Sequence, residues 1–206
     1  LEPSSAASDV YKRQMLLCII SLPSYAAVSA NVSFASDYIW RGMTQTDGPA
    51  ISGGFDFAAE NGFYAGIWGS NVNFNDEGTG SELDYYFGYS FDLNVFNIDL
   101  GYVAFDYPKN KSNLDFEELV LGISVSDFSF MYASGQDGAN DYIEISYPFG
   151  PINFSYGQYD DYGNNLLISY GFTCGGYDCS LAYSDFSEDG YESDEDAIVF
   201  SIAASF

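Results

Sequence analysis

The sequence predicts an all-β fold, a transmembrane antiparallel up-and-down β-barrel of about 12 strands. Three observations predict it. Apolar residues recur at every second position from residue 31 onward, and the connections between these runs alternate between short and long. The 206-residue chain also carries a formal net charge of −25 while 19% of its residues are aromatic. Disordered acidic chains are poor in aromatic residues, so we expect these side chains to be buried in a protein core or in lipid.

The N-terminal residues form two segments ahead of a single expected barrel domain, residues 27–206. Residues 1–14 show no strand pattern, and we interpret them as a non-native extension; a short disordered extension is the alternative. Residues 15–26 combine an apolar run with small residues at Ser24 and Ala26. This run is too short for a spanning helix but is typical of a signal peptide, here truncated at its start. A buried N-terminal helix is the other interpretation.

Period-two alternation identifies the strands, because successive side chains of a strand point to opposite faces. In the clearest run, Leu83, Tyr85 and Phe87 alternate with Glu82 and Asp84. Strands that span a membrane as a barrel need about 9–11 residues each. The expected strands are 31–40, 49–59, 62–72, 82–91, 95–106, 115–125, 127–134, 141–147, 151–159, 165–173, 178–185 and 196–206.

The connections differ in length and chemistry on the two sides of the predicted sheet. Tight turns follow the even-numbered strands, at 60–61, 92–94, 126, 148–150 and 174–177. Longer acidic loops follow the odd-numbered strands, at 41–48, 73–81, 107–114, 135–140, 160–164 and 186–195. Bacterial outer-membrane barrels have this asymmetry, with short periplasmic turns and long external loops. We therefore expect the protein in the outer membrane of a Gram-negative bacterium, in contact with its lipid.

The C-terminal strand carries a more specific signal. Phe200, Ile202 and the terminal Phe206 lie on one face of an alternating strand. A terminal aromatic residue in this position resembles the signal by which bacterial barrels are recognised, so we expect the barrel-assembly machinery to be a partner.

A water-soluble β-sandwich or barrel is the rival fold, because its apolar faces also alternate with polar ones. Such a fold places long charged residues on its outer face. Here the face opposite the apolar stripe is mainly Gly, Ser, Ala and Asn, and only 17% of all residues are charged. These features favour the membrane barrel, with a confined and wet interior.

Several segments resemble one known family. They are Ser36 to Gln45 with Pro49, Ala50 and Gly53, then residues 62–72, residues 82–89, Leu100-Gly101-Tyr102 and Tyr107-Pro108. In these segments the chain resembles the TorF-type porin family, conserved hypothetical outer-membrane proteins of proteobacteria. The resemblance spans most of residues 28–206 and is best before residue 125. It implies an exported barrel of undefined substrate and supplies no catalytic residue.

The interior face is predicted from strand parity, and the charged residues on this face are mainly acidic. Arg41 shares the parity of Asp37, but four residues of strand cover about 13 Å, so it is expected to meet an acid on another strand. Either Arg41 and the acids form a constriction for solutes, or Arg41 makes a structural ion pair; both interpretations stay open. The expected channel-lining residues are Asp37, Arg41, Asp56, Glu82, Asp84, Asp99, Glu118 and Glu144.

Other patterns suggest structure more than chemistry. Cys174 and Cys179 are close enough in an exported chain to form a local disulfide across a turn. Amphipathic rings such as Tyr38, Trp40, Tyr85, Tyr102 and Tyr170 are expected to form interfacial girdles. The acidic run 188–196 does not have the spacing of a calcium loop, so we predict no metal site and no cofactor.

Composition narrows the function. The chain has no His and only five Lys and Arg residues, which excludes Ser-His-Asp and Cys-His catalysis and disfavours nucleic acid as a partner. We predict no enzymatic activity. The first hypothesis is a porin or passive channel for small solutes, with a preference for cations from its acidic lumen. The alternative is a non-conducting barrel with a structural or surface-interaction role through its acidic outer loops.

Overall fold

The computed structural model of the protein describes residues 27–74, 80–109, 114–190 and 194–206. The expected extension 1–14 and signal peptide 15–26 lie outside the described residues, as does part of the acidic run 188–196. Among the residues with described structure, no helix has the length and hydropathy needed to cross a membrane.

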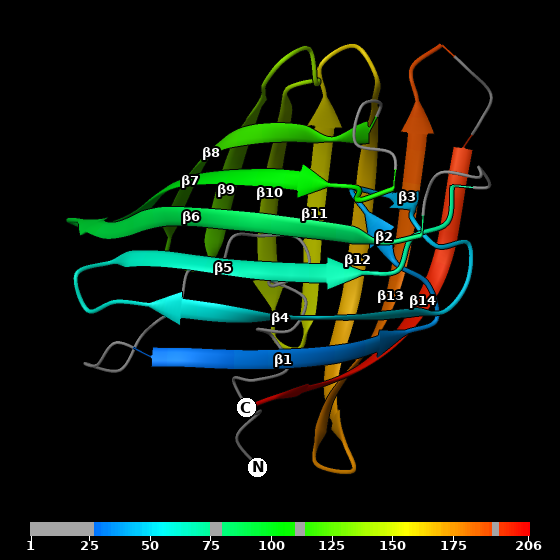
Figure 1. Cartoon of the computed structure of the whole chain (residues 1–206), viewed down its shortest axis with the longest axis horizontal. Helices are drawn as coiled ribbons and strands as arrows, with labels where there is room; N and C mark the ends of the chain where they lie inside the picture. Colours follow the sequence, from blue (N-terminus) through cyan, green and yellow to red (C-terminus); the bar gives the residue numbers. More distant parts are fainter. Residues whose placement is uncertain (1–26, 75–79, 110–113, 191–193) are drawn as a thin grey trace.

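Twelve strands form a closed antiparallel barrel, and two short strands form a separate hairpin (Figure 1). The barrel confirms the predicted fold class and strand number. In chain order the strands are β1 Ala27–Ala35, β2 Ile39–Trp40, β3 Met43–Thr44, β4 Ala50–Ala58, β5 Phe63–Ser70, β6 Glu82–Leu93, β7 Phe96–Asp106, β8 Phe116–Val125, β9 Phe128–Gly135, β10 Tyr142–Phe149, β11 Ile152–Tyr159, β12 Gly163–Cys174, β13 Tyr177–Glu188 and β14 Asp194–Ser205.

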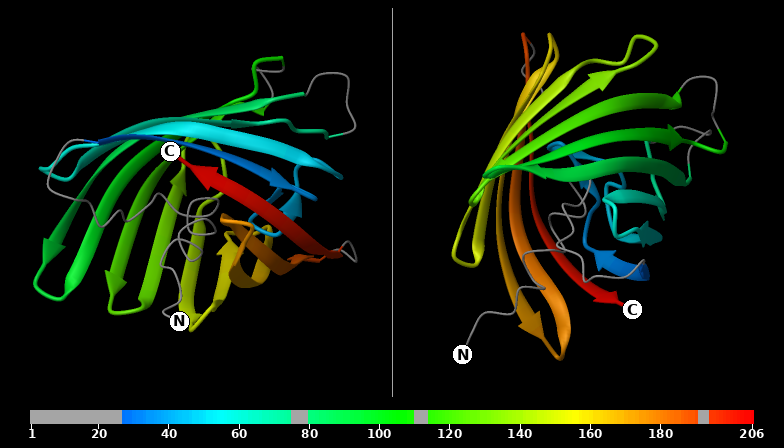
Figure 2. Two further views of the ribbon diagram at one scale, coloured as in Figure 1. Left: turned by 90° about the horizontal axis from the view of Figure 1, so that it is seen from below. Right: turned by 90° about the vertical axis from the view of Figure 1, so that its left-hand side faces the viewer.

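The barrel closes between the two ends of the chain. β14 pairs with β1, where Ile202 lies opposite Phe34. On its other edge β1 pairs directly with β4 over all nine of its residues, from Ala27–Ala58 to Ala35–Ala50. Figure 2 shows the sheet curling round until β14 returns to β1. Because β1 and β4 are neighbours in the wall, the β2–β3 hairpin between them in sequence is not needed to close it.

The two faces of the wall differ as the alternation predicts. Large apolar side chains such as Phe87, Leu100 and Ile198 are exposed on the outer face. The inner face holds buried polar residues, among them Glu82, Asp99, Asn165 and Ser201. Period-two sequences place alternate residues on opposite faces, so one pattern builds both the apolar exterior and the polar interior.

Most of the predicted strands agree with the structure to within three residues at each end. The first is wrong: β1 ends at Ala35, whereas the sequence pattern predicted a strand to residue 40. The apolar residues Tyr38 and Trp40 continue the alternation, but they belong to the hairpin, which leaves the wall. The connection predicted at 160–164 is also shorter, because β12 already begins at Gly163.

Glycines of the inner face provide space for tyrosine rings. Tyr64 of β5 lies opposite Gly88 of β6, and Tyr86 of β6 lies opposite Gly66 of β5. A Cβ added at Gly66 would stand 2.4 Å from the Tyr86 ring. The small residues that suggested a wet interior therefore lie partly beneath aromatic rings. Cross-strand contact between an aromatic ring and a glycine also fixes strand register.

Candidate functional site

The candidate site is built around the segment that joins β1 to β4. We call residues 36–48, which contain β2 and β3, the inner hairpin. Its two-residue turn, Arg41-Gly42, has positive φ at both positions, 49° and 92°. These angles define a type I′ turn, whose twist matches the twist of paired strands. Figure 1 shows the inner hairpin between the front and back strands of the barrel.

Polar side chains hold the base of the inner hairpin. The Thr44 hydroxyl donates to Asp37 Oδ1 at 2.8 Å, and the Thr46 hydroxyl donates to the same oxygen at 2.7 Å. The Thr46 hydroxyl oxygen also accepts a hydrogen bond from the Tyr38 N–H. The Gln45 N–H donates to the Tyr38 carbonyl oxygen at 2.7 Å. Asp37 thus organises the hairpin itself.

The inner hairpin reaches opposite walls of the barrel. The Tyr38 hydroxyl donates to Glu82 Oε1 on β6 at 2.8 Å. Gly42 packs so closely against β12 and β13 that an added Cβ would lie 2.7 Å from the Cβ of Asn165 and 2.8 Å from the Cβ of Phe186. Contacts on strands from opposite sides of the sheet mean that the hairpin crosses the lumen.

Arg41 makes the most extensive contacts of the inner hairpin. Its Nη1 and Nη2 each donate to a different carboxylate oxygen of Glu118 on β8, both at 2.7 Å. The guanidinium carbon lies 4.0 Å from the ring centroid of Tyr142 on β10 and 5.5 Å from that of Tyr159 on β11. It also lies 4.4 Å from the ring of Trp40. A planar guanidinium suits both a two-pronged carboxylate contact and ring stacking.

Burial and charge act in opposite directions on Arg41. Burial lowers the pKa of the Arg41 guanidinium, but the nearby Glu118 carboxylate raises it, and the net result is a pKa above the usual value. The side chain therefore stays positively charged inside the barrel. A buried ion pair of this kind is stable only while both partners are present.

Tyr38 anchors the other side of the inner hairpin. Its ring meets the Trp68 ring of β5 edge to face, with centroids 5.3 Å apart. Burial, reinforced by the charge of Glu82, raises the pKa of Tyr38, so its hydroxyl remains a donor. Asp84, two residues beyond Glu82, is also buried, and its Oδ1 has no hydrogen-bond partner among the described residues.

Two further carboxylates of the inner face accept hydrogen bonds from tyrosines that lie two strands away in the wall. Asp99 Oδ1 accepts a hydrogen bond from the Tyr64 hydroxyl at 2.7 Å. Asp56 accepts one from the Tyr86 hydroxyl. Oδ2 of Asp99 is buried without a hydrogen-bond partner among the described residues. These acids lie on the wall, apart from the Arg41–Glu118 pair.

The residues that were predicted from the sequence to line the channel fall into two groups. Six lie on the inner face of the wall: Asp56, Glu82, Asp84, Asp99, Glu118 and Glu144. Asp37 and Arg41 belong to the inner hairpin, because the strand predicted to carry them ends before residue 36. The structure brings Arg41 together with Glu118, an acid on another strand, and does not join Asp37 to any of the wall acids.

Sequence reasoning missed the aromatic part of the site. Tyr38 and Trp40 were expected in an interfacial girdle, yet Tyr38 is buried and Trp40 packs against Phe105 and Phe116 on the inner face. Tyr85 and Tyr170 are exposed on the outer face, and their place in a girdle stays a prediction. The inward turn had one local signal, Gly42 between short apolar runs, because two-residue hairpin turns favour glycine where φ is positive.

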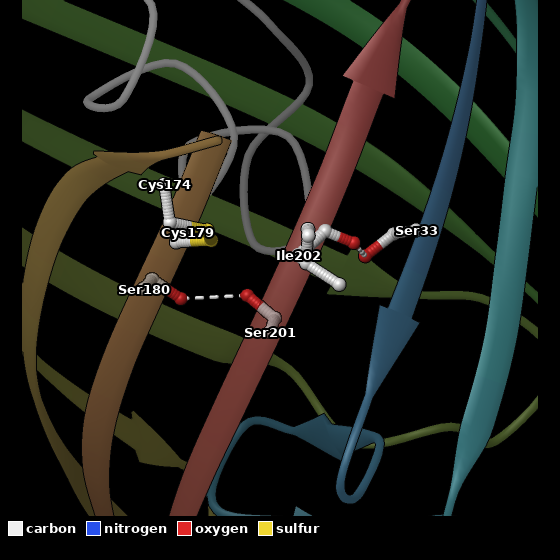
Figure 3. Close-up of a disulfide and its surroundings, with 6 residues drawn as sticks. All are labelled: Ser33, Cys174, Cys179, Ser180, Ser201 and Ile202. Atoms are coloured by element: carbon white, nitrogen blue, oxygen red, sulfur yellow. Dashed lines mark hydrogen bonds between the residues drawn. A yellow bond between two sulfur atoms is a disulfide. The ribbon is translucent and has the colours of Figure 1, made fainter. Parts of the chain in front are cut away.

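The opposite end of the barrel, which carries the short turns, is fastened covalently and by hydrogen bonds (Figure 3). A disulfide joins Cys174 and Cys179 across the β12–β13 turn. The hydroxyls of Ser180 and Ser201 point toward one another and lie 2.6 Å apart, linking β13 to β14. Ser33 of β1 donates to the Ile202 carbonyl oxygen at 3.4 Å.

The C-terminal residues take part in the closure of the barrel. The backbone N–H and carbonyl oxygen of Phe206 both bond to Ala30, at 2.9 and 3.1 Å. The Phe200 carbonyl oxygen accepts a hydrogen bond from the Ser36 N–H, and the Phe200 N–H donates to the Ser36 hydroxyl oxygen. Phe200, Ile202 and Phe206 thus lie along the seam between β14 and β1.

Potential metal ligands do not gather at the site. In the described part of the chain, no group of three or more Cys, Asp or Glu side chains is placed to hold a metal ion. Among the inner-face acids, Glu118 instead pairs with Arg41, and Glu82, Asp99 and Asp56 accept hydrogen bonds from tyrosine hydroxyls.

Comparisons with known proteins place the chain in a family without assigning a function. No curated protein matches it. Two similar solved structures are OccAB4 and OccAB3 of Acinetobacter baumannii, with 12% and 11% identity and a TM-score of 0.39 in both cases. They match over 84% and 90% of this chain, which spans 57% and 65% of their lengths. A family model matches residues 22–187, and the chain therefore belongs to Gcw_chp, a family of bacterial proteins of unknown function.

Proposed function

We propose that the protein is an outer-membrane channel for small solutes, with a preference for cations and a lumen narrowed by the inner hairpin. The observation that carries this proposal is the division of the closed barrel into an apolar outer face and a polar, acidic inner face. An outer face of this kind is stable against lipid, whereas in water it would be an aggregation surface. The resemblance of most of residues 28–206 to the TorF-type porin family supports the same function.

The inner face supports a preference for cations. In the described lumen, one positively charged side chain, that of Arg41, faces six wall carboxylates, those of Asp56, Glu82, Asp84, Asp99, Glu118 and Glu144. Carboxylates inside a pore of low dielectric constant concentrate cations and repel anions. The barrel-assembly machinery and outer-membrane lipid are the partners that this location requires.

Conductance measurements test the proposal. The full chain, folded in detergent, should migrate faster on a gel before boiling than after it, as stable membrane barrels do. In planar bilayers we expect discrete conductance steps, and in a potassium chloride gradient a reversal potential on the side of cation selectivity. A compact monomer that stays dissolved without detergent would contradict both the location and the channel.

The filled part of the lumen favours a second candidate function. The inner hairpin and the aromatic residues around it, among them Tyr142, Tyr159 and Phe186, form a continuous buried cluster. A barrel closed in this way could serve as a non-conducting scaffold that acts through its acidic loops. Correctly folded protein that shows no conductance at any voltage, in the wild type and in variants that release the hairpin, would support this second function over the first.

A further inference from the structure

The contacts of Arg41 divide between a segment that enters the lumen and residues of the permanent wall. Glu118, Tyr142 and Tyr159 belong to β8, β10 and β11, and we call them the wall pocket. Arg41 comes from the inner hairpin, which joins neighbouring strands that are already fully paired with each other. The three residues of the wall pocket are therefore held in place by wall strands and not by the inner hairpin. Arg41 is the group that occupies the pocket.

The wall pocket has the chemistry of a guanidinium receptor. The Glu118 carboxylate meets the two terminal nitrogens of the guanidinium at equal distances of 2.7 Å, in a two-pronged contact. The ring of Tyr142 lies 4.0 Å from the guanidinium carbon and contributes a cation–π contact. An ammonium group is a compact point charge and does not form this planar fork. The geometry thus distinguishes guanidinium from other cations.

Buried carboxylates of the wall also favour a cation at this position. Glu118 and Glu144 are buried, and so is Asp84, whose Oδ1 lacks a hydrogen-bond partner among the described residues. Without Arg41 the buried Glu118 carboxylate would lose its ion-pair partner, which is costly in a buried environment. When Arg41 is absent, a free cation of the right shape can therefore take its place beside Glu118 and compensate the charge of that carboxylate.

Displacement of the inner hairpin leaves the strand pairing of the wall intact, because β1 and β4 pair directly with each other. β2 and β3 pair through only two residue pairs, and the bonds to Asp37 lie within the hairpin. Its links to the barrel include the Tyr38–Glu82 hydrogen bond, a bond from the Thr44 N–H to Glu195, and aromatic contacts of Tyr38 and Trp40 with the wall. Displacement of this segment exposes the pocket to the lumen.

We propose that the wall pocket of Glu118, Tyr142 and Tyr159 binds solutes that carry a guanidinium group, and that such a solute displaces Arg41 and with it the inner hairpin. Arg41 acts as a tethered substitute for the solute and keeps the lumen narrow in its absence. This inference rests on the proposed function, because the solute has to enter the barrel to reach the pocket.

Binding is tested with the full chain in detergent micelles. Trp40, one of two tryptophans, lies 4.4 Å from the Arg41 guanidinium carbon, so its fluorescence reports on the pocket. A W68F background removes the second signal. The probes are ethylguanidinium chloride and, as the matched control, n-propylammonium chloride, both at equal ionic strength and below denaturing concentrations.

Three results are expected together. R41A should bind ethylguanidinium saturably and at least tenfold more tightly than n-propylammonium. The R41A/E118Q variant should lose this discrimination, because the amide that replaces the carboxylate offers one acceptor oxygen and no charge. The wild type should respond to ethylguanidinium at concentrations at least tenfold higher than R41A does, since the probe has to displace Arg41.

The inference is overturned if R41A binds the two cations equally or neither of them. It is also overturned if the wild type never responds while R41A does, because Arg41 is then a permanent anchor. If R41A does not fold, R41K takes its place, since lysine keeps the charge but cannot form the fork. Failure of the proposed channel function gives a different result. If the protein binds ethylguanidinium but never conducts ions, the pocket is supported and the channel function is refuted.

Discussion

Tyr64 and Gly88 lie directly opposite each other on β5 and β6, and the tyrosine covers the glycine so closely that a Cβ at position 88 would stand 2.3 Å from the Tyr64 hydroxyl oxygen. The same hydroxyl donates to Asp99 on β7 at 2.7 Å. One tyrosine thereby links three consecutive strands, and it can do so only because its neighbour has no side chain.

Replacing this glycine should destabilise the barrel. In G88A the new methyl group also meets the Leu100 carbonyl oxygen at 2.7 Å, so the tyrosine cannot simply move away. Overpacking of this kind costs about 1–3 kcal/mol. The measurement is the urea midpoint at which the heat-modifiable band is lost. G80A is the matched control, since a Cβ there meets nothing within 4 Å, and an equal shift in both variants would contradict the prediction.

The Arg41–Glu118 pair should behave as a coupled unit. We expect R41A to lower the free energy of unfolding by about 3–5 kcal/mol, because Glu118 is left buried and uncompensated. R41A/E118Q should recover part of this loss. A double-mutant cycle by urea unfolding measures the coupling. The exposed turn acid Glu60 supplies a control, E60Q, and additive effects of the R41A and E118Q substitutions would show that the pair is not coupled.

Gly42 tests whether the inner hairpin limits conductance. In G42A the side chain would collide with β12 and β13 and would also have to adopt a φ of +92°. The hairpin should therefore leave its position, and the single-channel conductance should rise by a factor of about two or more while the barrel stays heat-modifiable. G138A is the control, because Gly138 has a similar φ of +98° but open space around it. Unchanged conductance in G42A would mean that the hairpin does not limit the pore.

Two inner-face acids should set the ion preference. The D99N/E144Q variant replaces two carboxyl groups of the lumen with amides, and the reversal potential in a potassium chloride gradient should move toward zero. The D137N variant removes a charge from an exposed loop and should leave the reversal potential where it is. A reversal potential that D99N/E144Q does not change would place the origin of any selectivity elsewhere.

Asp141 should produce a small acid-dependent loss of stability. The Tyr132 hydroxyl, which donates to Asp141 Oδ2 at 2.5 Å, and the Gly135 N–H lower the pKa of this carboxyl below its usual range. A lowered pKa stabilises the folded state above the unfolded pKa of about 3.9, and this contribution is lost as the pH falls through the folded value.

Thermal melts of the wild type and of D141N measure this contribution. The two proteins should differ at pH 6, and the difference should shrink as the pH falls below the unfolded pKa. D137N, in the same loop, should follow the wild type throughout. A difference between the wild type and D141N that is constant from pH 6 to pH 3 would contradict the assignment.

Local alternation explains how much of the wall was predictable. Residues 82–91 alternate acids and small residues with Leu83, Tyr85 and Phe87, and the structure places those three on the outer face. The same rule located all twelve wall strands, since period two depends only on the sequence within each strand. It failed at residues 36–40, where the alternation continues into the inner hairpin although the strand ends at Ala35.

The sequence by itself therefore determined the barrel, its number of strands, its inner and outer faces and the unequal lengths of its connections, because each depends on neighbours within one strand or one turn. Only the tertiary structure decided that the inner hairpin turns into the lumen, that Arg41 meets Glu118 across 77 positions of sequence, and that tyrosines lie over glycines. These contacts depend on how strands are set side by side when the barrel closes, which no single strand encodes.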